Sequence, residues 1–332
     1  MKALQCVELA GPEKLIFSEI DDPNPGNGEV LIEIKAASVN FPDVLMIQGL
    51  YQNQPPMPFI PGAECSGLIK EIGEGVDNCN VGDRVFVMAG TGCFAEKLVV
   101  EATRITPIPS TMDFPVAAAL PMTYGTSLYA LKQRANLQPG ETLLVLGAAG
   151  GVGISAIEIG KAMGARVIAA ASSEEKTNVC LEHGADEAFV YPSGNLDRDQ
   201  QKELSNKVKE LTSGLGANVV YDPVGGSFSE PAIRAMAWEG RFLVIGFAAG
   251  EIPKPPLNLA LLKNCQIVGV FWGAWTLMFP AEYEKNLLEL FKLHADGKIN
   301  PEISDRFSLE ESAAAIAHLK DRKAKGKVII DV

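Results

Sequence analysis

The chain has 332 residues, of which 47% are hydrophobic and 21% are charged, and its net charge is −12. The length suffices for two domains with a large core, and the composition is ordinary for a globular protein. Such an acidic chain is a poor general binder of nucleic acids or anionic membranes, although a local basic patch can hold one phosphate ligand. No apolar run reaches the roughly 18 residues of a transmembrane helix, and the N-terminus lacks a signal or transit pattern, so we expect a cytoplasmic protein.

Residues 1 to about 120 have the pattern of a β-rich domain. Glu29–Ala36 alternates polar and apolar residues, which is typical of a half-buried strand. Further short strands are predicted at Ser66–Ile72, Arg84–Met88 and Phe94–Val100, and glycine turns separate them. Short strands at this density indicate a compact, barrel-like β fold.

A glycine-rich turn organises the middle of the chain. The apolar run Leu143–Leu146 predicts a buried parallel strand, and the turn GAAGGVG leads from it into a predicted helix, Val152–Gly164. Gly150 there allows the backbone to approach a pyrophosphate, Gly153 allows the helix to pack closely on the strand, and the helix start directs unpaired N–H groups at phosphates. Ala148 occupies the position of the first glycine in a G-x-G-x-x-G fingerprint. The stretch predicts a dinucleotide site; the alternative is a strand–helix turn without a ligand.

The end of the next predicted strand, Val167–Ala171, indicates which dinucleotide binds. NAD-dependent enzymes usually have an acidic residue at that point, which accepts a hydrogen bond from the ribose 2′-hydroxyl. Here Ser172 and Ser173 follow the strand, and Lys176 lies one helical turn further on. Two hydroxyls and a cation suit a 2′-phosphate, which favours NADPH. The pair Glu174–Glu175 lies at a helix start, where acids are stabilised by the helix dipole.

Strands and helices alternate from the glycine turn onward. The further strands are predicted at Glu187–Val190, Asn218–Asp222, Arg241–Gly246 and Gln266–Phe271, and the further helices at Glu174–His183, Asp199–Thr212 and Ser229–Trp238. Helices at Pro115–Leu120 and Thr126–Ala135 precede this series, and a helix Pro280–Ala295, a strand Ile303–Ser308, a helix Leu309–Asp321 and a strand Lys327–Val332 follow it. The pattern predicts an α/β protein in which a doubly wound Rossmann domain, residues 124–263, is inserted into a β-rich domain formed by residues 1–123 and 264–332.

With these features the chain resembles the medium-chain dehydrogenase/reductase superfamily, specifically its zinc-independent quinone oxidoreductase branch, over essentially its full length. The matching residues around the glycine turn are Gly140-Glu141, Leu144, Ala148-Ala149-Gly150-Gly151, Gly153 and Lys161. One position departs from the branch's signature, because Glu158 stands where Gln is expected. The resemblance implies that the β-rich domain is GroES-like and carries the substrate side of the site.

The resemblance also bears on zinc. Zinc alcohol dehydrogenases of the superfamily take a Cys and a His from the first domain, but Asn40 and Ala63 stand at the matching positions. The only histidines, His183, His294 and His318, are predicted on helices elsewhere. A catalytic zinc site needs three protein ligands, so we expect no metal, and Glu64 is interpreted as a structural hydrogen-bonding residue.

The segment Asn40–Tyr51 looks like the family's substrate-side loop. Asn40 can donate a hydrogen bond to a substrate oxygen, and Tyr51 can donate a proton or hold a carbonyl. Equally, Asn40 can serve only to shape its turn, and Tyr51 can be a packing aromatic. The resemblance implies a 2′-phosphate and adenine side with Lys176, Tyr191 and Arg322. It implies the following further cofactor contacts: Thr126, Gly150, Gly151, Val152, Gly153, Ser172, Ser173, Gly246, Phe247, Phe271, Trp272 and Gly273.

The expected reaction is direct hydride transfer from NADPH, without a metal, to a small-molecule quinone or α,β-unsaturated carbonyl. A 2-enoyl thioester reductase is one alternative, since the segment MIQGLY also resembles that branch. An NADPH-binding sensor or structural protein with little turnover is another. The family commonly pairs through its last Rossmann strand, so we expect a homodimer formed through Gln266–Phe271, an apolar edge that needs a cover.

Overall fold

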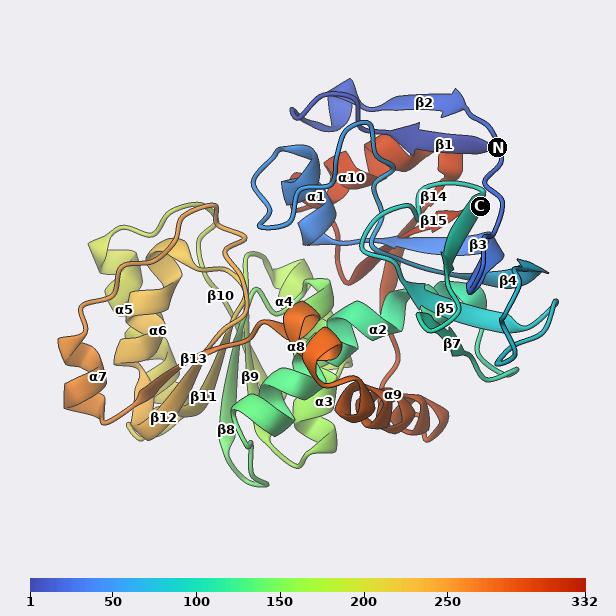
Figure 1. The fold of residues 1–332 in the computed structure, drawn as a ribbon. Coiled ribbons are helices and arrows are strands. Elements are labelled where there is room, and N and C mark those ends of the chain that lie inside the picture. Colours follow the sequence, from blue (N-terminus) through green and yellow to red (C-terminus); the bar gives the residue numbers. More distant parts are fainter. The chain divides into compact units, whose positions relative to one another are not determined.

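The computed structural model describes residues 1–332, and they form two compact units (Figure 1). The first unit comprises Met1–Met122 and Pro301–Val332, and the second comprises Thr123–Asn300. The sequence placed the return to the first domain at residue 264, whereas residues 264–300 group with the second unit. The reason is that the strand Gln266–Gly269 pairs with the Rossmann sheet and the helices after it pack in the same unit.

The first unit is built on a mostly antiparallel sheet of seven strands. Its order is β14-β15-β3-β4-β5-β7, with β6 paired to β3, and β1 and β2 form a separate two-stranded sheet. The bounds are β1 (Lys2–Gln5), β2 (Ile16–Glu19), β3 (Glu29–Val39), β4 (Glu64–Ile72), β5 (Arg84–Met88), β6 (Lys97–Glu101), β7 (Ile105–Pro107), β14 (Ile303–Ser308) and β15 (Lys327–Asp331). Alternate residues of β3 to β6 enter one apolar core, which confirms the β-rich domain.

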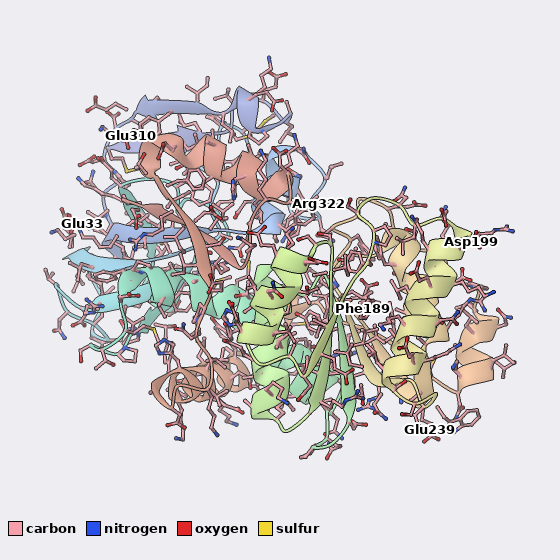
Figure 2. All side chains as sticks on the ribbon, turned by 180° about the vertical axis from the view of Figure 1, so that it is seen from behind. Glu33, Phe189, Asp199, Glu239, Glu310 and Arg322 are labelled. Atoms are coloured by element: carbon pink, nitrogen blue, oxygen red, sulfur yellow. The ribbon has the colours of Figure 1, made fainter.

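Short helices close this sheet. They are η1 (Pro12–Lys14), α1 (Phe41–Ile47), η4 (Leu309–Glu311) and α10 (Ser312–Lys320). Figure 2 labels Glu310 and Arg322 at the two ends of the η4–α10 segment. Glu310 pairs with Lys2 at 3.0 Å, which ties this C-terminal segment to the first strand of the chain.

The second unit is a six-stranded parallel sheet in the order β10-β9-β8-β11-β12-β13. Its strands are β8 (Thr142–Leu146), β9 (Arg166–Ala171), β10 (Glu187–Val190), β11 (Ala217–Asp222), β12 (Met236–Val244) and β13 (Gln266–Gly269). The strands β8, β9 and β11 are nearly continuous apolar runs because helices cover both faces of the sheet. The order reverses between β8 and β11, as in a doubly wound fold, so ligands are expected at the carboxyl ends of these strands.

The helices of this unit are α3 (Gly151–Ala162), α4 (Glu174–Glu182), α5 (Arg198–Leu211), η3 (Gly226–Phe228), α6 (Ser229–Arg234), α7 (Asn258–Lys263), α8 (Trp272–Met278) and α9 (Pro280–Ala295). Figure 1 shows α5 and α6 on one face of the sheet and α3 on the other. No helix in the protein has both the length and the apolar character needed to span a membrane.

The region 114–135 differs from the two helices predicted there. A single helix, α2 (Phe114–Leu128), runs through Pro121 and continues as a π-helical turn, η2 (Tyr129–Arg134). Pro121 removes one backbone donor but does not end the helix. The alanines just before it, Ala117–Ala119, are fully buried, so their tertiary packing outweighs the lost hydrogen bond.

Candidate functional site

The glycine turn lies between β8 and α3, and Gly150 is the N-cap of α3. A Cβ added at Gly153 would lie 2.5 Å from the carbonyl oxygens of Gly147 and Ala148, so the turn cannot close around any larger residue. A Cβ at Gly150 would meet only the Gly147 oxygen, at 3.5 Å, which is an ordinary contact. The fold therefore requires a glycine at 153 but leaves space at 150, where the helix directs its first N–H groups, including those of Gly151 and Val152.

Hydrogen bonds among buried hydroxyl groups connect α3, which follows this turn, to its neighbours. Ser127 Oγ lies 2.8 Å from Ser155 Oγ and 2.8 Å from the Tyr221 hydroxyl, and Ser155 donates to the carbonyl of Thr123 at 3.0 Å. These contacts join the end of α2 to the first turns of α3 and to β11. They fix the half-buried Thr126, which neighbours Ser127, near the start of α3.

The predicted 2′-phosphate residues follow β9. Ser173 is the N-cap of α4, and its Oγ accepts a hydrogen bond from the backbone N–H of Lys176 at 3.3 Å. Ser172, Ser173 and Lys176 are half-buried. Glu174 and Glu175 occupy the first turn of α4 and are exposed, as expected of residues that only stabilise the helix start.

Tyr191 and Arg322 occupy different surroundings. Tyr191 follows β10 and is buried in the apolar cluster of the second unit, with its ring 4.8 Å from that of Phe228. Arg322 belongs to the first unit, in the turn after α10, and has a φ of 59° (Figure 2). Their roles toward a cofactor stay predictions.

Five of the predicted nicotinamide-side residues follow β12 and β13. Gly246 and Phe247 are half-buried, and Phe247 packs beside Gly225. Phe271 is 57% exposed, and Trp272 is 5% exposed. The Trp272 indole lies against Gly125, where an added Cβ would be 2.6 Å from the ring, so Trp272 packs in the interior beside the residue that precedes Thr126. Gly273 is exposed in the first turn of α8.

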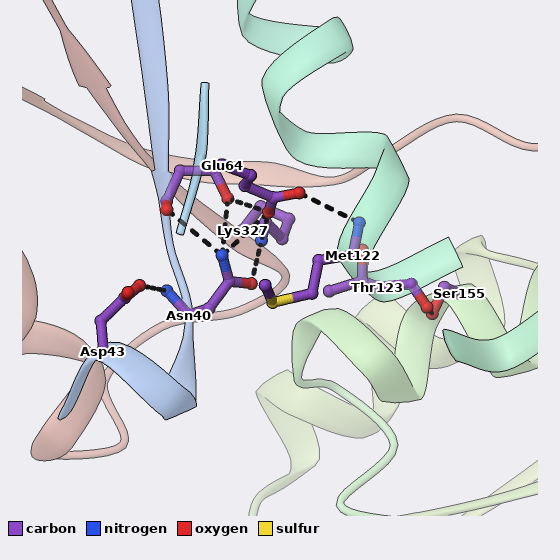
Figure 3. Close-up of polar contacts among 8 residues, drawn as sticks. Asn40, Asp43, Glu64, Met122, Thr123, Ser155 and Lys327 are labelled. Atoms are coloured by element: carbon purple, nitrogen blue, oxygen red, sulfur yellow. Dashed lines mark hydrogen bonds and ion pairs between the residues drawn. The ribbon is translucent and has the colours of Figure 1, made fainter. Parts of the chain in front are cut away.

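The first unit contains a buried polar network around Asn40 (Figure 3). Lys327 Nζ donates to Asn40 Oδ1 at 2.7 Å and pairs with Glu64 Oε1 at 3.0 Å. Asn40 Nδ2 donates to Glu64 Oε1 at 2.8 Å and to the Ser38 carbonyl at 3.2 Å. Glu64 also accepts from the Ser38 hydroxyl at 2.6 Å and, through Oε2, from the Met122 N–H at 3.0 Å.

This network changes what Asn40 can do. Both ends of its amide are used inside the unit, and the lysine can only donate, which settles which end is oxygen. Glu64 hydrogen-bonds as the sequence suggested. Lys327 was not foreseen as a site residue; the only signal is a lysine directly before the apolar run Val328–Ile330.

Asp43 lies next to this network on α1. Its Oδ2 accepts from the backbone N–H of Asn40 at 2.8 Å, and its Oδ1 is buried without a hydrogen-bond partner. Burial raises the pKa of Asp43 to about 7, against the opposing effect of the Asn40 hydrogen bond. The segment predicted as a loop is thus partly a helix, which Pro42 and this carboxylate begin.

Tyr51 follows α1 and packs partly buried at the edge of the core of the first unit. Its hydroxyl makes no hydrogen bond with another residue. Burial, and then the charge of Asp43, raise the pKa of the Tyr51 hydroxyl. The hydroxyl therefore stays protonated at neutral pH and is a potential donor to a ligand.

Glu158, the residue that departs from the family's signature, is a buried junction within the second unit. Its Oε2 accepts from the Tyr124 hydroxyl at 2.6 Å and from the Asn300 N–H at 2.9 Å, and its Oε1 lies 2.7 Å from His183 Nδ1. Tyr124 and Asn300 lie close to the two points where the chain passes between the units. Sequence reasoning placed Glu158 on α3 but did not identify these partners.

The side chains offer no donor set for a metal ion. No group of three or more His, Cys, Asp and Glu residues is arranged to hold one. Ala63 is buried at the start of β4, and Asn40 is held by the contacts above. His183 is the C-cap of α4, His294 lies on α9 and His318 on α10, where it lies 3.1 Å from Asp305.

Comparisons with known proteins agree with this architecture. Residues 26–110 match the alcohol dehydrogenase GroES-like domain, and residues 151–292 match the zinc-binding dehydrogenase family. The quinone oxidoreductase-like protein 2 homolog of Nematostella vectensis is 38% identical over 99% of this chain and 88% of its own. A mycobacterial structure in complex with NADPH has a TM-score of 0.91 at 29% identity. Escherichia coli quinone oxidoreductase in complex with NADPH has a TM-score of 0.90 at 26% identity. Each comparison covers 100% of both chains. The chain therefore belongs to the medium-chain dehydrogenase/reductase superfamily of oxidoreductases, among its quinone oxidoreductase-like members.

Proposed function

We propose that the protein is an NADPH-dependent reductase of quinones or α,β-unsaturated carbonyls that works without a metal. The main support is the glycine turn. Packing within the chain requires a glycine at 153, whereas there is open space beside Gly150. Space that the fold does not need, at the start of a twelve-residue helix, supports the approach of a pyrophosphate. The two relatives solved with NADPH support the same cofactor.

The residues at the glycine turn and after β9 suit two parts of this cofactor. Backbone N–H groups of residues 151–153 would hold the pyrophosphate, which Gly150 leaves room to approach, and Ser172, Ser173 and Lys176 would hold the 2′-phosphate. Thr126 and the segments 246–247 and 271–273 would lie on the nicotinamide side, and Tyr191 and Arg322 would complete the adenine side. When bound, NADPH supplies the hydride; the protein orients the acceptor and excludes water.

Tyr51 is the better of the two proposed catalytic residues for contact with the acceptor. Its hydroxyl has no partner in the chain, whereas both ends of the Asn40 amide are held by Lys327, Glu64 and Ser38. We assign Tyr51 the hydrogen bond to the acceptor's oxygen. Asn40 would shape the adjoining surface.

The test is NADPH oxidation measured over a panel of ortho- and para-quinones, small enones and enoyl-CoA thioesters. The proposal expects turnover with quinones or enones, and a Tyr51→Phe variant in which quinone reduction is slower by up to about tenfold, through the loss of one hydrogen bond, but is not abolished. A sharp fall of kcat in Tyr51→Phe, with saturation only by the thioester, would instead identify an enoyl thioester reductase. Tight NADPH binding with no oxidation across the panel would identify a binding protein without turnover.

NADPH preference has its own test. Lys176→Ala is expected to weaken NADPH binding at least tenfold, corresponding to about 1.4 kcal/mol, while leaving NADH binding unchanged. Lys161→Ala is a suitable control because Lys161 pairs with Asp186 at 2.7 Å on the far end of α3. Equal affinity of the unmodified protein for NADH and NADPH would refute the 2′-phosphate site.

We further propose that the protein forms a homodimer through β13. This strand is the edge of the six-stranded sheet, and Ile267 is 44% exposed on it. Phe271, just beyond the strand, is also exposed, so the edge carries apolar side chains beside unpaired backbone groups. Pairing with β13 of a second copy would cover the apolar side chains and satisfy the backbone groups of this edge.

A further inference from the structure

A groove on the second unit is lined by five cationic side chains and by no acidic one. It has a volume of about 540 Å³ and lies between α5, α6 and α7. The cations are Arg198, Lys202, Lys209, Arg234 and Lys263. None of the residues proposed to bind NADPH lines this basic groove. The chain has 41 acidic and 29 basic residues, so the groove is opposite in charge to the molecule as a whole.

Helix α5 supplies the longest wall of the basic groove. Arg198, Lys202 and Lys209 are spaced four and seven residues apart, which places them on one face of the helix. The acids of α5 follow each of them by one residue, at Asp199, Glu203 and Glu210, and so lie on a neighbouring face. Figure 2 labels Asp199 at the start of this helix. The helix thus separates its charges and turns the positive stripe to the groove.

The chain leaves most of this charge uncompensated. Arg198, Lys202 and Lys209 form no ion pair or side-chain hydrogen bond with other residues, whereas Arg234 pairs with Glu230 at 2.7 Å. Lys263 donates to the carbonyl of Met236 at 2.9 Å. Burial, and then the charge of Lys209, lower the pKa of Lys263, so like charges oppose each other across the groove.

The groove also has an apolar part. Leu259 is buried beneath it, while Leu262 is 66% exposed at its side. Pro231 adds a further apolar contact, and Ser205 is the buried polar group on α5. A fully hydrated inorganic anion would use the cations but leave this apolar surface uncovered.

From the charge, size and apolar floor, we propose that the basic groove binds a small organic phosphate at a site separate from the cofactor site. A phosphate monoester carries close to two negative charges and three acceptor oxygens, which suits several lysines that bind as point charges. The volume is that of a small-molecule pocket. An apolar chain on the phosphate would cover the exposed Leu262.

The test is isothermal titration calorimetry of the protein with decyl phosphate below its critical micelle concentration, with and without saturating NADPH. We expect one site in both conditions, with inorganic phosphate and decanol each binding at least about tenfold more weakly. The double variant Lys202→Glu/Lys209→Glu should weaken decyl phosphate binding about thirtyfold or more. It should leave the affinity for NADPH unchanged.

Lys207→Glu is the matched control, because Lys207 lies on the same helix outside the groove and pairs with Glu210 at 3.2 Å. It should change decyl phosphate affinity less than twofold, and Lys202→Gln/Lys209→Gln provides a milder variant if the double charge reversal alters folding. Equal binding to the Lys202/Lys209 variants and the unmodified protein would overturn the proposal. Inorganic phosphate binding as tightly as decyl phosphate would overturn its organic part.

Discussion

At the scale of single residues, two buried polar networks are each organised by a charged side chain: Glu158 in the second unit and Lys327 in the first. Glu158 contacts three groups on different segments, and Lys327 lies in a strand that is 287 and 263 residues away in sequence from its partners Asn40 and Glu64. Neither set of partners follows from local patterns, because the contacts depend on how distant segments fold together. The sequence shows that residue 40 carries an amide and residue 64 a carboxylate, but it does not show which groups they contact.

Replacing Glu158 should show how much its junction stabilises the second unit. Glu158→Ala removes the carboxylate that accepts from the buried Tyr124 hydroxyl and from the Asn300 N–H, so the free energy of unfolding should fall by about 3 kcal/mol. Glu158→Gln retains an acceptor and should cost about 1 kcal/mol. Denaturant titration followed by circular dichroism measures both, with the exposed Glu182→Gln as control. A Glu158→Ala variant as stable as that control would contradict the buried junction.

Asp43 should impose a pH dependence on stability. Its pKa of about 7 in the folded protein exceeds the roughly 3.9 of an unfolded Asp, so the folded state binds more protons between these values. Stability contributed by protonated Asp43 is thus complete below about pH 4 and is lost as pH rises through 7, by up to about 4 kcal/mol.

Asp43→Asn should remove this pH dependence of stability, because an amide does not titrate. The Asn side chain can still accept from the Asn40 N–H. The difference in melting temperature between the variant and the unmodified protein should grow in the variant's favour from pH 4 to pH 7. A difference that does not change over this interval would contradict a raised pKa at Asp43.

At the scale of elements, periodic segments were predictable and short or interrupted ones were not. The strand and helix of the glycine turn, the helix Pro280–Ala295 and the strand Ile303–Ser308 agree with their patterns. α1 was predicted as a loop because seven residues are too few to show helical periodicity. α2 was divided at Pro121 because the burial that keeps it continuous is a tertiary effect.

The two glycines of the turn should respond oppositely to the same substitution. Gly153→Ala forces contacts of 2.5 Å with backbone oxygens and should lower the melting temperature of the protein without cofactor by several degrees. Gly150→Ala meets only an ordinary contact, so its stability should be nearly unchanged while NADPH affinity falls about tenfold. Thermal unfolding and NADPH titration test both, and unchanged NADPH affinity in Gly150→Ala would argue against cofactor approach at this residue.

At the scale of the whole molecule, the chain pattern identified a β-rich domain interrupted by a Rossmann domain, but it placed the second crossing too early. The change of pattern after residue 271 is real, yet α8 and α9 still pack in the second unit. Sequence periodicity marks where a sheet ends, whereas a domain boundary depends on which core the following helices cover. The short edge strand β13, with Ile267 and the neighbouring Phe271 exposed, is a molecular-scale feature that the fold leaves uncovered.

The proposed dimer should depend on this edge. Ile267→Glu introduces a charge into an apolar interface and should convert a dimer to a monomer at micromolar concentration, because a buried unpaired charge is strongly unfavourable. Light scattering after size-exclusion chromatography measures the mass, and Val190→Glu, exposed on the opposite edge strand β10, is the control. An unmodified protein that is already monomeric would remove the dimer proposal.

The central claim is direct reduction of a conjugated acceptor by NADPH. It is tested most directly with NADPH deuterated at the transferable position of the nicotinamide, an enone acceptor, and mass analysis of the product. Direct hydride transfer predicts one deuterium on carbon in the reduced enone and a primary isotope effect on turnover. NADPH oxidation that leaves no deuterium in the product, or no oxidation with any enone or quinone, would contradict it.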